Sequence, residues 1–499
     1  GGRSQMELFL EPTRSRIHSQ ASQQWLAGQG ITIPRLDARL LNRYFADFAA
    51  TGFLPSSALA MKQPPCAGQL QRMVESALAP APQLCNFSAT PMGGETGILS
   101  ELAAARSGGR TGLWHCQGRT QAGELNAVLK LKPDDAEQDA LMLATAALCS
   151  AELEQAFADH LQHMPYRLAM NRERAIAQMT DPRIARHMPA TLGILQEAEG
   201  ISGILYGYLD DVQWAHGSPD GVPWSAAHLD AAVRGMGEIH AVWLGREQEL
   251  LASGWIAEQA CGPGLLTMGP LWEALADFAG PRLAGMLGRD AMGEQRAWIA
   301  SMDAWLPASF AMPRTLIHHD FNPRNLAFWP TAAGLQLCAY DWELATLGLP
   351  QYDLVELLCH VLPDEGRGDI AASSMEAHRA ALEAASGQAL DRDAWRAGMA
   401  LALRCFIICR IPMYVMVDRF RPQAFLPRVV RNAWWLAAWL EAAPARRLLS
   451  AVQMHDEAFQ VEEIASRECR QQGQDDDACG NQTLVHDVSF RDGTAIGGL

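Results

Sequence analysis

Apolar residues along this chain follow helical spacing in some segments and strand spacing in others. From about 7 to 60, and again from about 134 to 179, they recur every three or four positions, which predicts helices. From about 82 to 133, short apolar runs alternate with glycine-rich turns, which predicts strands, and a second strand pair is expected over 189–209. Beyond about 211 the spacing is mostly helical, as far as about 460.

This change of pattern predicts an α+β protein in which a small β-rich lobe precedes a larger helical lobe. One interruption of the helical lobe carries strand-length apolar bursts and most of the unusual polar residues. The last segment is rich in Gln, Asp and Gly, which is typical of flexible chain. The expected segments are an N-terminal helical extension (1–80), the β-rich N-lobe (81–212) with a helical insertion at about 134–165, the C-lobe (213–465) and a flexible tail (466–499).

Composition and charge narrow the classes of function. Hydrophobic residues make up 49% of the 499 residues, so a large core is available. The net charge is −16, from 40 Lys and Arg against 56 Asp and Glu. A nucleic-acid or anionic-membrane binder needs a basic face, so we expect neither kind of partner.

The cysteines and the apolar runs indicate a compartment. None of the 11 cysteines forms a C-x-x-C pair, and several lie in apolar runs, which predicts reduced, buried thiols. No signal-peptide core follows Met6. The longest apolar run is interrupted by Arg404, Arg410 and Pro412, so no membrane span is expected. These features predict a cytoplasmic protein.

Lysine is rare in this chain and is therefore informative. Of the 40 basic residues only Lys62, Lys130 and Lys132 are lysine. Lys130 and Lys132 stand two residues apart on one predicted strand and therefore on the same face. An ammonium group is a compact point charge, whereas a guanidinium is a planar fork, so a surviving lysine suggests a place where the point charge is needed.

The densest polar segment carries a pattern suited to phosphoryl transfer. His318 and Asp320 begin H-x-D-x-x-x-x-N, which ends at Asn325, and Asp341 follows sixteen residues later. A phosphoryl transferase needs one carboxylate to accept the proton of the attacking hydroxyl. It also needs an amide oxygen and a second carboxylate to hold Mg²⁺ against the nucleotide phosphates. This segment supplies all three groups.

The pattern resembles the catalytic loop of the aminoglycoside phosphotransferase/choline kinase-like family, which has a bilobal protein-kinase-like fold. The resemblance implies that Asp320 is the catalytic base, that Asn325 and Asp341 are Mg²⁺ ligands, and that His318 is a structural residue of the loop. It covers roughly residues 85 to 440. The activity it implies uses ATP and Mg²⁺.

The same resemblance assigns the lysines and their partner. Ala127-Val-Leu-Lys130 is similar to the V-A-I-K strand of the protein kinases, in which the lysine contacts phosphates and a glutamate holds it. Lys130 is therefore preferred, with Lys132 as the alternative. A block around Glu173 resembles that of the ecdysteroid kinase-like branch and favours this residue as the partner. The rival partners are Glu152 and Glu154.

Two further segments resemble the family. Gly93, Gly94 and Gly97 stand where a phosphate-covering loop is expected, although such a turn is common in hairpins, and a Walker A sequence is absent. Asp353 lies in a G-x-P-x-x-D-L segment, where the resemblance implies a carboxylate that caps a helix behind the catalytic loop. Its spacing from Glu356 also fits a capping box. His240 lies on an apolar helix face and is expected in the core.

We therefore expect a small-molecule kinase that transfers the γ-phosphate of ATP to a hydroxyl group. The acidic balance is compatible with a cationic acceptor such as an aminoglycoside or a choline-like amine, and the Trp and Met content with a hydrophobic acceptor such as a macrolide or a steroid. One alternative is a catalytically silent kinase-like binding module. A less favoured one is a non-haem iron oxygenase that uses His318 and Asp320 with His360 or His378.

Overall fold

A computed structural model describes most of the second of two compact units, Gly1–Lys62 and Gln63–Leu499. The described residues are 24–26, 28–29, 64–78, 82–92, 110–164, 166–198, 201–214, 224–256 and 263–442. All elements named below lie in the second unit. Most of the predicted N-terminal extension, the glycines 93, 94 and 97 and the predicted tail lie outside the described residues.

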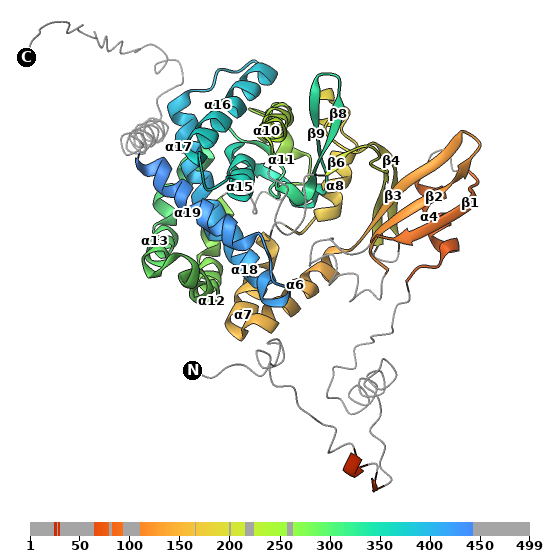
Figure 1. Ribbon diagram of the computed structural model, residues 1–499, viewed down its shortest axis with the longest axis horizontal. Helices are drawn as coiled ribbons and strands as arrows, with labels where there is room; N and C mark the ends of the chain where they lie inside the picture. The colour runs from red at the N-terminus through yellow and green to blue at the C-terminus, as the bar shows by residue number, and fades with distance from the viewer. Residues whose placement is uncertain are drawn as a thin grey trace, which may run out of the picture. The chain divides into compact units, whose positions relative to one another are not determined.

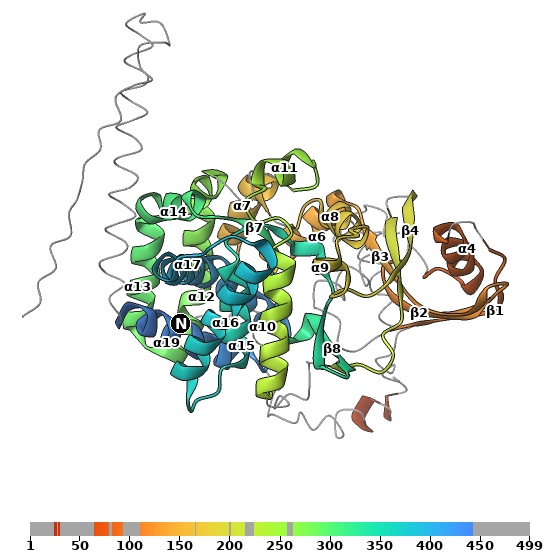
Figure 2. The same cartoon turned by 90° about the horizontal axis from the view of Figure 1, so that it is seen from above.

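A five-stranded antiparallel sheet forms the small lobe, with strand order β1-β2-β3-β5-β4 (Figure 1). Helix α4 covers one face, so that the sheet lies between α4 and the helical lobe in Figure 2. Gly193 allows this packing, because a Cβ there would lie 2.1 Å from the carbonyl oxygen of Ala77 on α4. The bounds are α4 Ala67–Ala77, β1 Cys85–Pro91, β2 Gly112–Thr120, β3 Gly123–Pro133, β4 Thr191–Ala198 and β5 Ile201–Gly207.

Alternation along β3 decides where the two lysines lie. Leu129 and Leu131 are fully buried in the core between the sheet and α4. Lys130 and Lys132 alternate with these leucines and therefore point to the opposite face of the sheet, toward the helical lobe. Lys130 is fixed in the centre of the sheet, opposite Leu113 of β2 and Ile204 of β5.

The helices that follow β3 join the core of the larger lobe. Leu153 and Phe157 of α7 are fully buried in that core, and α7 contacts α12. These helices occupy the segment for which an insertion is predicted. Helix α8 then returns to the sheet and contacts β5. The bounds are α6 Asp135–Cys149, α7 Ala151–His160, η1 Leu161–His163, α8 Ala169–Ala177 and α9 Pro182–Ala185.

The larger lobe is built from helices around one apolar core (Figure 1). Helix α15 lies in its middle and is buried on nearly all sides, because Tyr352 to His360 are all buried. The remaining helices surround it. Their bounds are α10 Ala226–His240, α11 Glu247–Ala252, η3 Pro263–Met268, α12 Gly269–Leu287, α13 Arg289–Ala300, α14 Met302–Ala311, α15 Gln351–Val361, α16 Arg367–Ser386, α17 Arg392–Cys405, η6 Phe406–Arg410, α18 Ile411–Phe420 and α19 Leu426–Ala442.

Helices α17 and α18 form one continuous helix through the π-helical segment η6. Pro412 has no N–H group and would clash with a regular preceding turn, which accounts for the widened turn before it. This helix, Arg392–Phe420, is long and apolar enough to cross a membrane, with a mean hydropathy of 1.8 in its most apolar 18 residues. The expectation that Arg404, Arg410 and Pro412 interrupt the run was therefore wrong. Of that window, 61% is buried inside the protein, as in a core helix.

Short strands frame the loop that carries the predicted catalytic residues. Strand β7 pairs with β10 just before and after the loop, and the hairpin β8–β9 pairs with β6 beside it. The bounds are β6 Gln213–Trp214, β7 Thr315–Ile317, η4 Pro323–Asn325, β8 Leu326–Thr331, β9 Gly334–Ala339, η5 Trp342–Leu344 and β10 Thr346–Gly348. The predicted α+β organisation, with a small sheet lobe and a larger helical lobe, is confirmed.

Candidate active site

Asp320 is held in one orientation by two amide side chains. The Asn322 amide donates to Asp320 Oδ1 at 2.9 Å, and the Asn325 amide donates to Asp320 Oδ2 at 2.7 Å and to its backbone carbonyl at 2.9 Å. The Asp320 side chain keeps 21% of its surface exposed. A carboxylate that is fixed but still accessible is suited to accept a proton from a bound hydroxyl.

Lys130 connects the sheet to both carboxylates that face it. Its Nζ donates to Glu173 Oε1 on α8 at 2.7 Å and to Asp341 Oδ1 at 2.5 Å. The hydroxyl of Tyr206 donates to the same Glu173 oxygen at 3.3 Å. Glu173, which lies 43 residues beyond Lys130 in sequence, therefore meets it in space, as favoured by the sequence.

The rival partners lie elsewhere. Glu152 and Glu154 are exposed on α7, whose buried face is turned to the core of the larger lobe through Leu153. Neither contacts Lys130 in the structure. The roles of Lys130 and Glu173 toward a nucleotide remain predictions.

Burial and charge act against each other at these three groups. Burial alone would lower the pKa of Lys130, but the neighbouring Asp341 and Glu173 carboxylates raise it above its ordinary value, so the ammonium stays charged. Burial would raise the pKa of Asp341, but Lys130 and Lys132 hold it well below its ordinary value. For Glu173 burial dominates and raises the pKa, although Lys130 opposes the shift.

A second ion pair lies two residues further along β3 and along the loop after β9. Lys132 pairs with Glu343, so that lysines two residues apart on β3 meet carboxylates two residues apart after β9. The buried Arg172 adds a third connection, because its guanidinium donates to the backbone carbonyl of Glu343 at 2.6 Å. Sequence reasoning identified neither contact, since both join segments that are far apart in the chain.

Several carboxylates near Lys130 lie close to one another and could hold a metal ion. Among the described residues, the carboxylates of Glu173, Asp341 and Glu343 form the group close enough to hold a metal, with oxygens within 4.8 Å of one another. His318 and Asp320 belong to no such group in the part of the chain that the structure describes. The open five-stranded sheet and the helical lobe are not the β-sandwich-like barrel of the iron-oxygenase alternative, so the fold disfavours that alternative.

The predicted Mg²⁺ ligands fit a hard cation. Asn325 spends both amide hydrogens on Asp320, which leaves its side-chain oxygen as the group that can bind a cation. Asp341 is kept ionised, and its backbone lies in the left-handed region with φ of 66°. An amide oxygen and a carboxylate are the donor types that Mg²⁺ prefers.

Asp353 holds the catalytic loop from behind. Its carboxylate accepts the backbone N–H groups of His318 at 2.6 Å and of His319 at 2.8 Å, as well as His240 Nε2 at 3.0 Å. The expectation of a helix cap was wrong, because Asp353 lies inside α15, where Pro350 is the N-cap residue and makes no side-chain cap. Its carboxylate orders the His319 backbone, whose φ of 61° is strained for a residue with a side chain.

The buried residues around this carboxylate complete the support. His240 is in the core, as expected, and its other ring nitrogen lies 3.1 Å from His378. His318 Nε2 lies 3.0 Å from the Tyr340 carbonyl, just before Asp341, so it ties the two loops together. His318 is thus a structural residue of the loop.

Glu356 gives the loop a second anchor one turn along α15. It accepts the Phe321 N–H at 3.1 Å and the Tyr414 hydroxyl at 2.6 Å. Burial, together with the nearby Asp320 carboxylate, raises its pKa to about 7, against the opposing effect of Arg410. The predicted capping box between Asp353 and Glu356 is absent: both carboxylates bind the catalytic loop.

Arg410, at the end of η6, reaches the catalytic loop from the helical lobe. Its guanidinium donates to the His319 carbonyl, and Nη1 lies 4.0 Å from Asp320 Oδ1. Sequence reasoning did not identify this role, since Arg410 stands out in the sequence only as a charge within an apolar run. The π-helical turn before it is a feature often found at functional sites.

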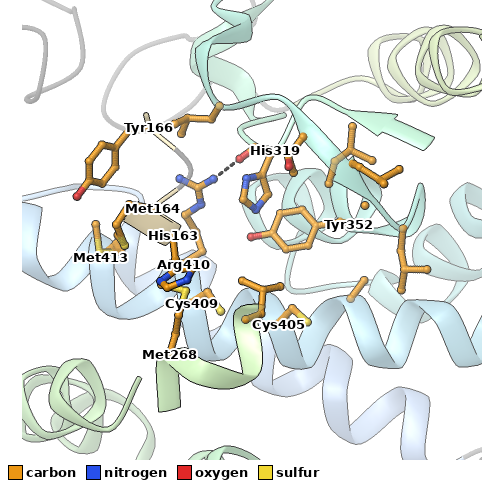
Figure 3. A pocket seen from close by; sticks show the side chains of 18 of the residues that line it. His163, Met164, Tyr166, Met268, His319, Tyr352, Cys405, Cys409, Arg410 and Met413 are labelled. Carbon is orange, nitrogen blue, oxygen red and sulfur yellow. Dashed lines mark hydrogen bonds between the residues drawn. The ribbon is translucent and has the colours of Figure 1, made fainter. Parts of the chain in front are cut away.

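Beside Arg410 lies a cavity of about 210 Å³ (Figure 3). His319, Tyr352 and Arg410 project into it from the catalytic loop, α15 and η6. Met164 and Tyr166 line it from the segment before α8. The cavity is thus bordered by the same loop that carries Asp320.

Comparison with known proteins identifies the family. The model of a family described as the phosphotransferase enzyme family matches residues 119–401, more than half of the chain. The chain belongs to the phosphotransferase enzyme family. The matched residues include Lys130, Glu173, Asp320, Asn325 and Asp341, so the kinase-like fold and the family implied by the motifs are confirmed. The ecdysteroid kinase-like branch remains a prediction.

Solved structures of phosphotransferases are distantly similar. A choline/ethanolamine kinase family protein from Mesorhizobium loti is 15% identical, with 71% of this chain and 97% of that chain covered and a TM-score of 0.34. A choline kinase from Streptococcus pneumoniae is 10% identical over 75% and 99%, with a TM-score of 0.34. An ethanolamine kinase from Plasmodium vivax is 9% identical over 70% and 82%, with a TM-score of 0.36.

Likeness of this degree carries no argument about activity, and the family assignment rests on the sequence match. No curated protein matches this chain. What this member of the phosphotransferase enzyme family acts on must therefore be argued from its own residues.

Proposed function

We propose that this phosphotransferase moves the γ-phosphate of ATP to a hydroxyl group of a small molecule. The observation that carries the proposal is the double contact of Lys130, which touches Glu173 and Asp341 at once. That contact joins the sheet lobe to the loop after β9. The loop after β9 is in turn joined to the catalytic loop, because the Tyr340 N–H donates to the Asn325 carbonyl at 3.0 Å.

Each residue has a defined part in the transfer. Asp320 accepts the proton as the acceptor oxygen forms a bond to the γ-phosphorus, while the bond from that phosphorus to the β–γ bridging oxygen breaks and ADP leaves. Lys130, held by Glu173, binds the phosphates. Mg²⁺, when bound by Asn325 and Asp341, neutralises charge on the phosphates. The glycines 93, 94 and 97 are proposed to cover the phosphates.

The test begins with nucleotide binding. Calorimetry with ATP and MgCl₂ should show one site per chain, and binding should weaken when MgCl₂ is replaced by a chelator. A screen of hydroxylated small molecules should then yield an acceptor that gains the mass of one phosphoryl group. If the protein binds ATP with no transfer to any acceptor, or binds no ATP, the alternative of a silent kinase-like binding module is favoured.

A further inference from the structure

The cavity beside Arg410 has a lining unlike the rest of the candidate active site. It is enclosed by elements of both lobes: Lys132 and Pro133 of β3 line it from the sheet lobe, and α6, η1, α12, α14, α17 and α18 line it from the helical lobe. Five methionines contribute to it, and methionine adapts to irregular apolar ligands because it is unbranched and polarisable. The methionines are Met142, Met164, Met268, Met302 and Met413.

The position of the cavity connects it to the chemistry. Arg410 lines it and lies 4.0 Å from Asp320, and His319 lines it from the position next to Asp320 in the chain. At another edge of the cavity lie Lys132 and Glu343, the pair adjacent to Lys130 and Asp341. A molecule in this cavity would therefore border, at one edge, the residues beside Asp320 and, at another edge, the pair adjacent to Lys130 and Asp341.

The charges on the wall disfavour a cationic ligand. Among the described residues that line the cavity, Glu343 carries the only carboxylate, and it is paired with Lys132. Arg314 and Arg410 add positive charge to the wall. Burial and the charge of Arg410 lower the pKa of His319 to about 3, so this imidazole is neutral at physiological pH. An ammonium group would be desolvated here without a free carboxylate to bind it.

Nor do the wall cations require an anionic ligand. Lys132 already has Glu343 as its partner, and Arg410 lies beside Asp320. Apolar and aromatic side chains such as Trp272, Leu306 and Phe310 make up most of the remaining wall. Such a lining favours a ligand that buries hydrocarbon surface.

A few buried polar atoms remain to be matched by a ligand. Tyr166 is 7% exposed, and its hydroxyl has no hydrogen-bond partner among the described residues. The Nδ1 atom of His163 is also buried and has no hydrogen-bond partner among the described residues, and His163 also lines the cavity. A buried hydroxyl without a partner is costly, so a ligand hydroxyl or carbonyl would be bound here.

We propose that this cavity binds the acceptor, and that the acceptor is an uncharged, lipophilic alcohol. The inference rests on the proposed function and adds the chemical class of its substrate. The apolar wall holds the hydrocarbon part, Tyr166 and His163 bind polar groups of the acceptor, and the reacting hydroxyl lies at the end of the cavity that Arg410 and His319 border.

Calorimetry without nucleotide tests this directly. The probes are two uncharged alcohols, farnesol and estradiol, and two cations, choline and kanamycin. Ser309→Phe on α14 fills the cavity, while Ala304→Phe places the same side chain on the exposed face of the same helix. Met413→Trp on α18 is a second filling variant, in case Ser309→Phe does not fold.

We expect at least one alcohol to bind to the unchanged protein. Its affinity should be at least about tenfold weaker for the filled variants, and it should be the same for Ala304→Phe as for the unchanged protein. ATP affinity should be the same in all variants. Failure of both alcohols, or binding of a cation that the filling variants abolish, would overturn the inference. Failure of ATP binding would instead contradict the proposed function, so the two failures are distinguishable.

Discussion

Lys132 forms an ion pair with Glu343, two residues along from Lys130 and Asp341 in both segments. Both partners are less than a quarter exposed. The sheet lobe is thus joined to the loop after β9 by two adjacent pairs. The Lys132–Glu343 pair, called the outer pair below, gives Lys132 a structural role, whereas Lys130 is proposed to bind phosphates.

The outer pair should stabilise the closed contact between the lobes. Lys132→Met and Glu343→Gln should each lower the free energy of unfolding, with an interaction energy of about 0.5–3 kcal/mol in a double-mutant cycle measured by urea denaturation. ATP affinity should change less than in Lys130→Met. Strict additivity of the two substitutions would show that the pair contributes nothing.

Lys130 and Glu173 should act together on nucleotide affinity. Lys130→Met removes the ammonium that we place at the phosphates, and Glu173→Gln weakens its hold on that position. Both should raise the Kd for ATP in calorimetry, by about tenfold or more for Lys130→Met. Glu152→Gln changes an exposed carboxylate on α7 and is the matched control. Equal effects of Glu152→Gln and Glu173→Gln would contradict the pairing.

Asp353 should make the fold sensitive to acid. Burial alone would raise its pKa, but the hydrogen bond from His240 and the neighbouring His318 lower it on balance. The carboxylate therefore contributes stability above its unfolded pKa, and this stability is lost as pH falls below about 4 through the folded value.

Asp353→Asn should cost about 3–5 kcal/mol at pH 7 and should flatten the acid limb of the stability curve. Urea denaturation from pH 3 to 7 measures both. The exposed Asp369→Asn on α16 is the control and should change stability by less than about 1 kcal/mol. An unchanged acid limb in Asp353→Asn would refute the anchoring role.

Glu356 should make the protein less stable as pH rises, which is opposite to the effect expected of Asp353. Burial raises its pKa from 4.5 to about 7, so the folded state binds an extra proton between these values. Stability linked to this group is therefore lost as pH rises from about 4.5 to 7, on the order of 3 kcal/mol in total. In Glu356→Gln this loss should disappear, which the same denaturation series would show as a smaller decline toward pH 7. A decline equal to that of the unchanged protein would contradict the assignment.

The sequence predicted those features of the site that depend on the spacing of residues close together in the chain. His318, Asp320, Asn325 and Asp341 lie within 24 residues, so their spacing identified the catalytic loop without any knowledge of packing. Lys130 was found because lysine is rare in this chain and because Ala127-Val-Leu-Lys130 is similar to the V-A-I-K strand of the protein kinases.

The sequence did not predict contacts that arise only from packing. Arg410 lies some 90 residues beyond Asp320, inside a helix whose pattern shows only that it is apolar. Arg172 stands next to Glu173 in the sequence, but its contact with the Glu343 carbonyl joins segments far apart in the chain. Asp353 was expected to cap a helix because its spacing to Glu356 fits that motif, yet both carboxylates turn to the catalytic loop. Such outcomes depend on which helix faces which loop.

Transfer of labelled γ-phosphate from ATP, in Asp320→Asn compared with the unchanged protein, is the most direct test of the central claim. With an acceptor found in the screen, the substitution should lower kcat by about 10²–10⁴-fold. It should leave the Kd for ATP within about threefold, since Lys130 and Glu173 are untouched. Unchanged transfer by Asp320→Asn would contradict the account.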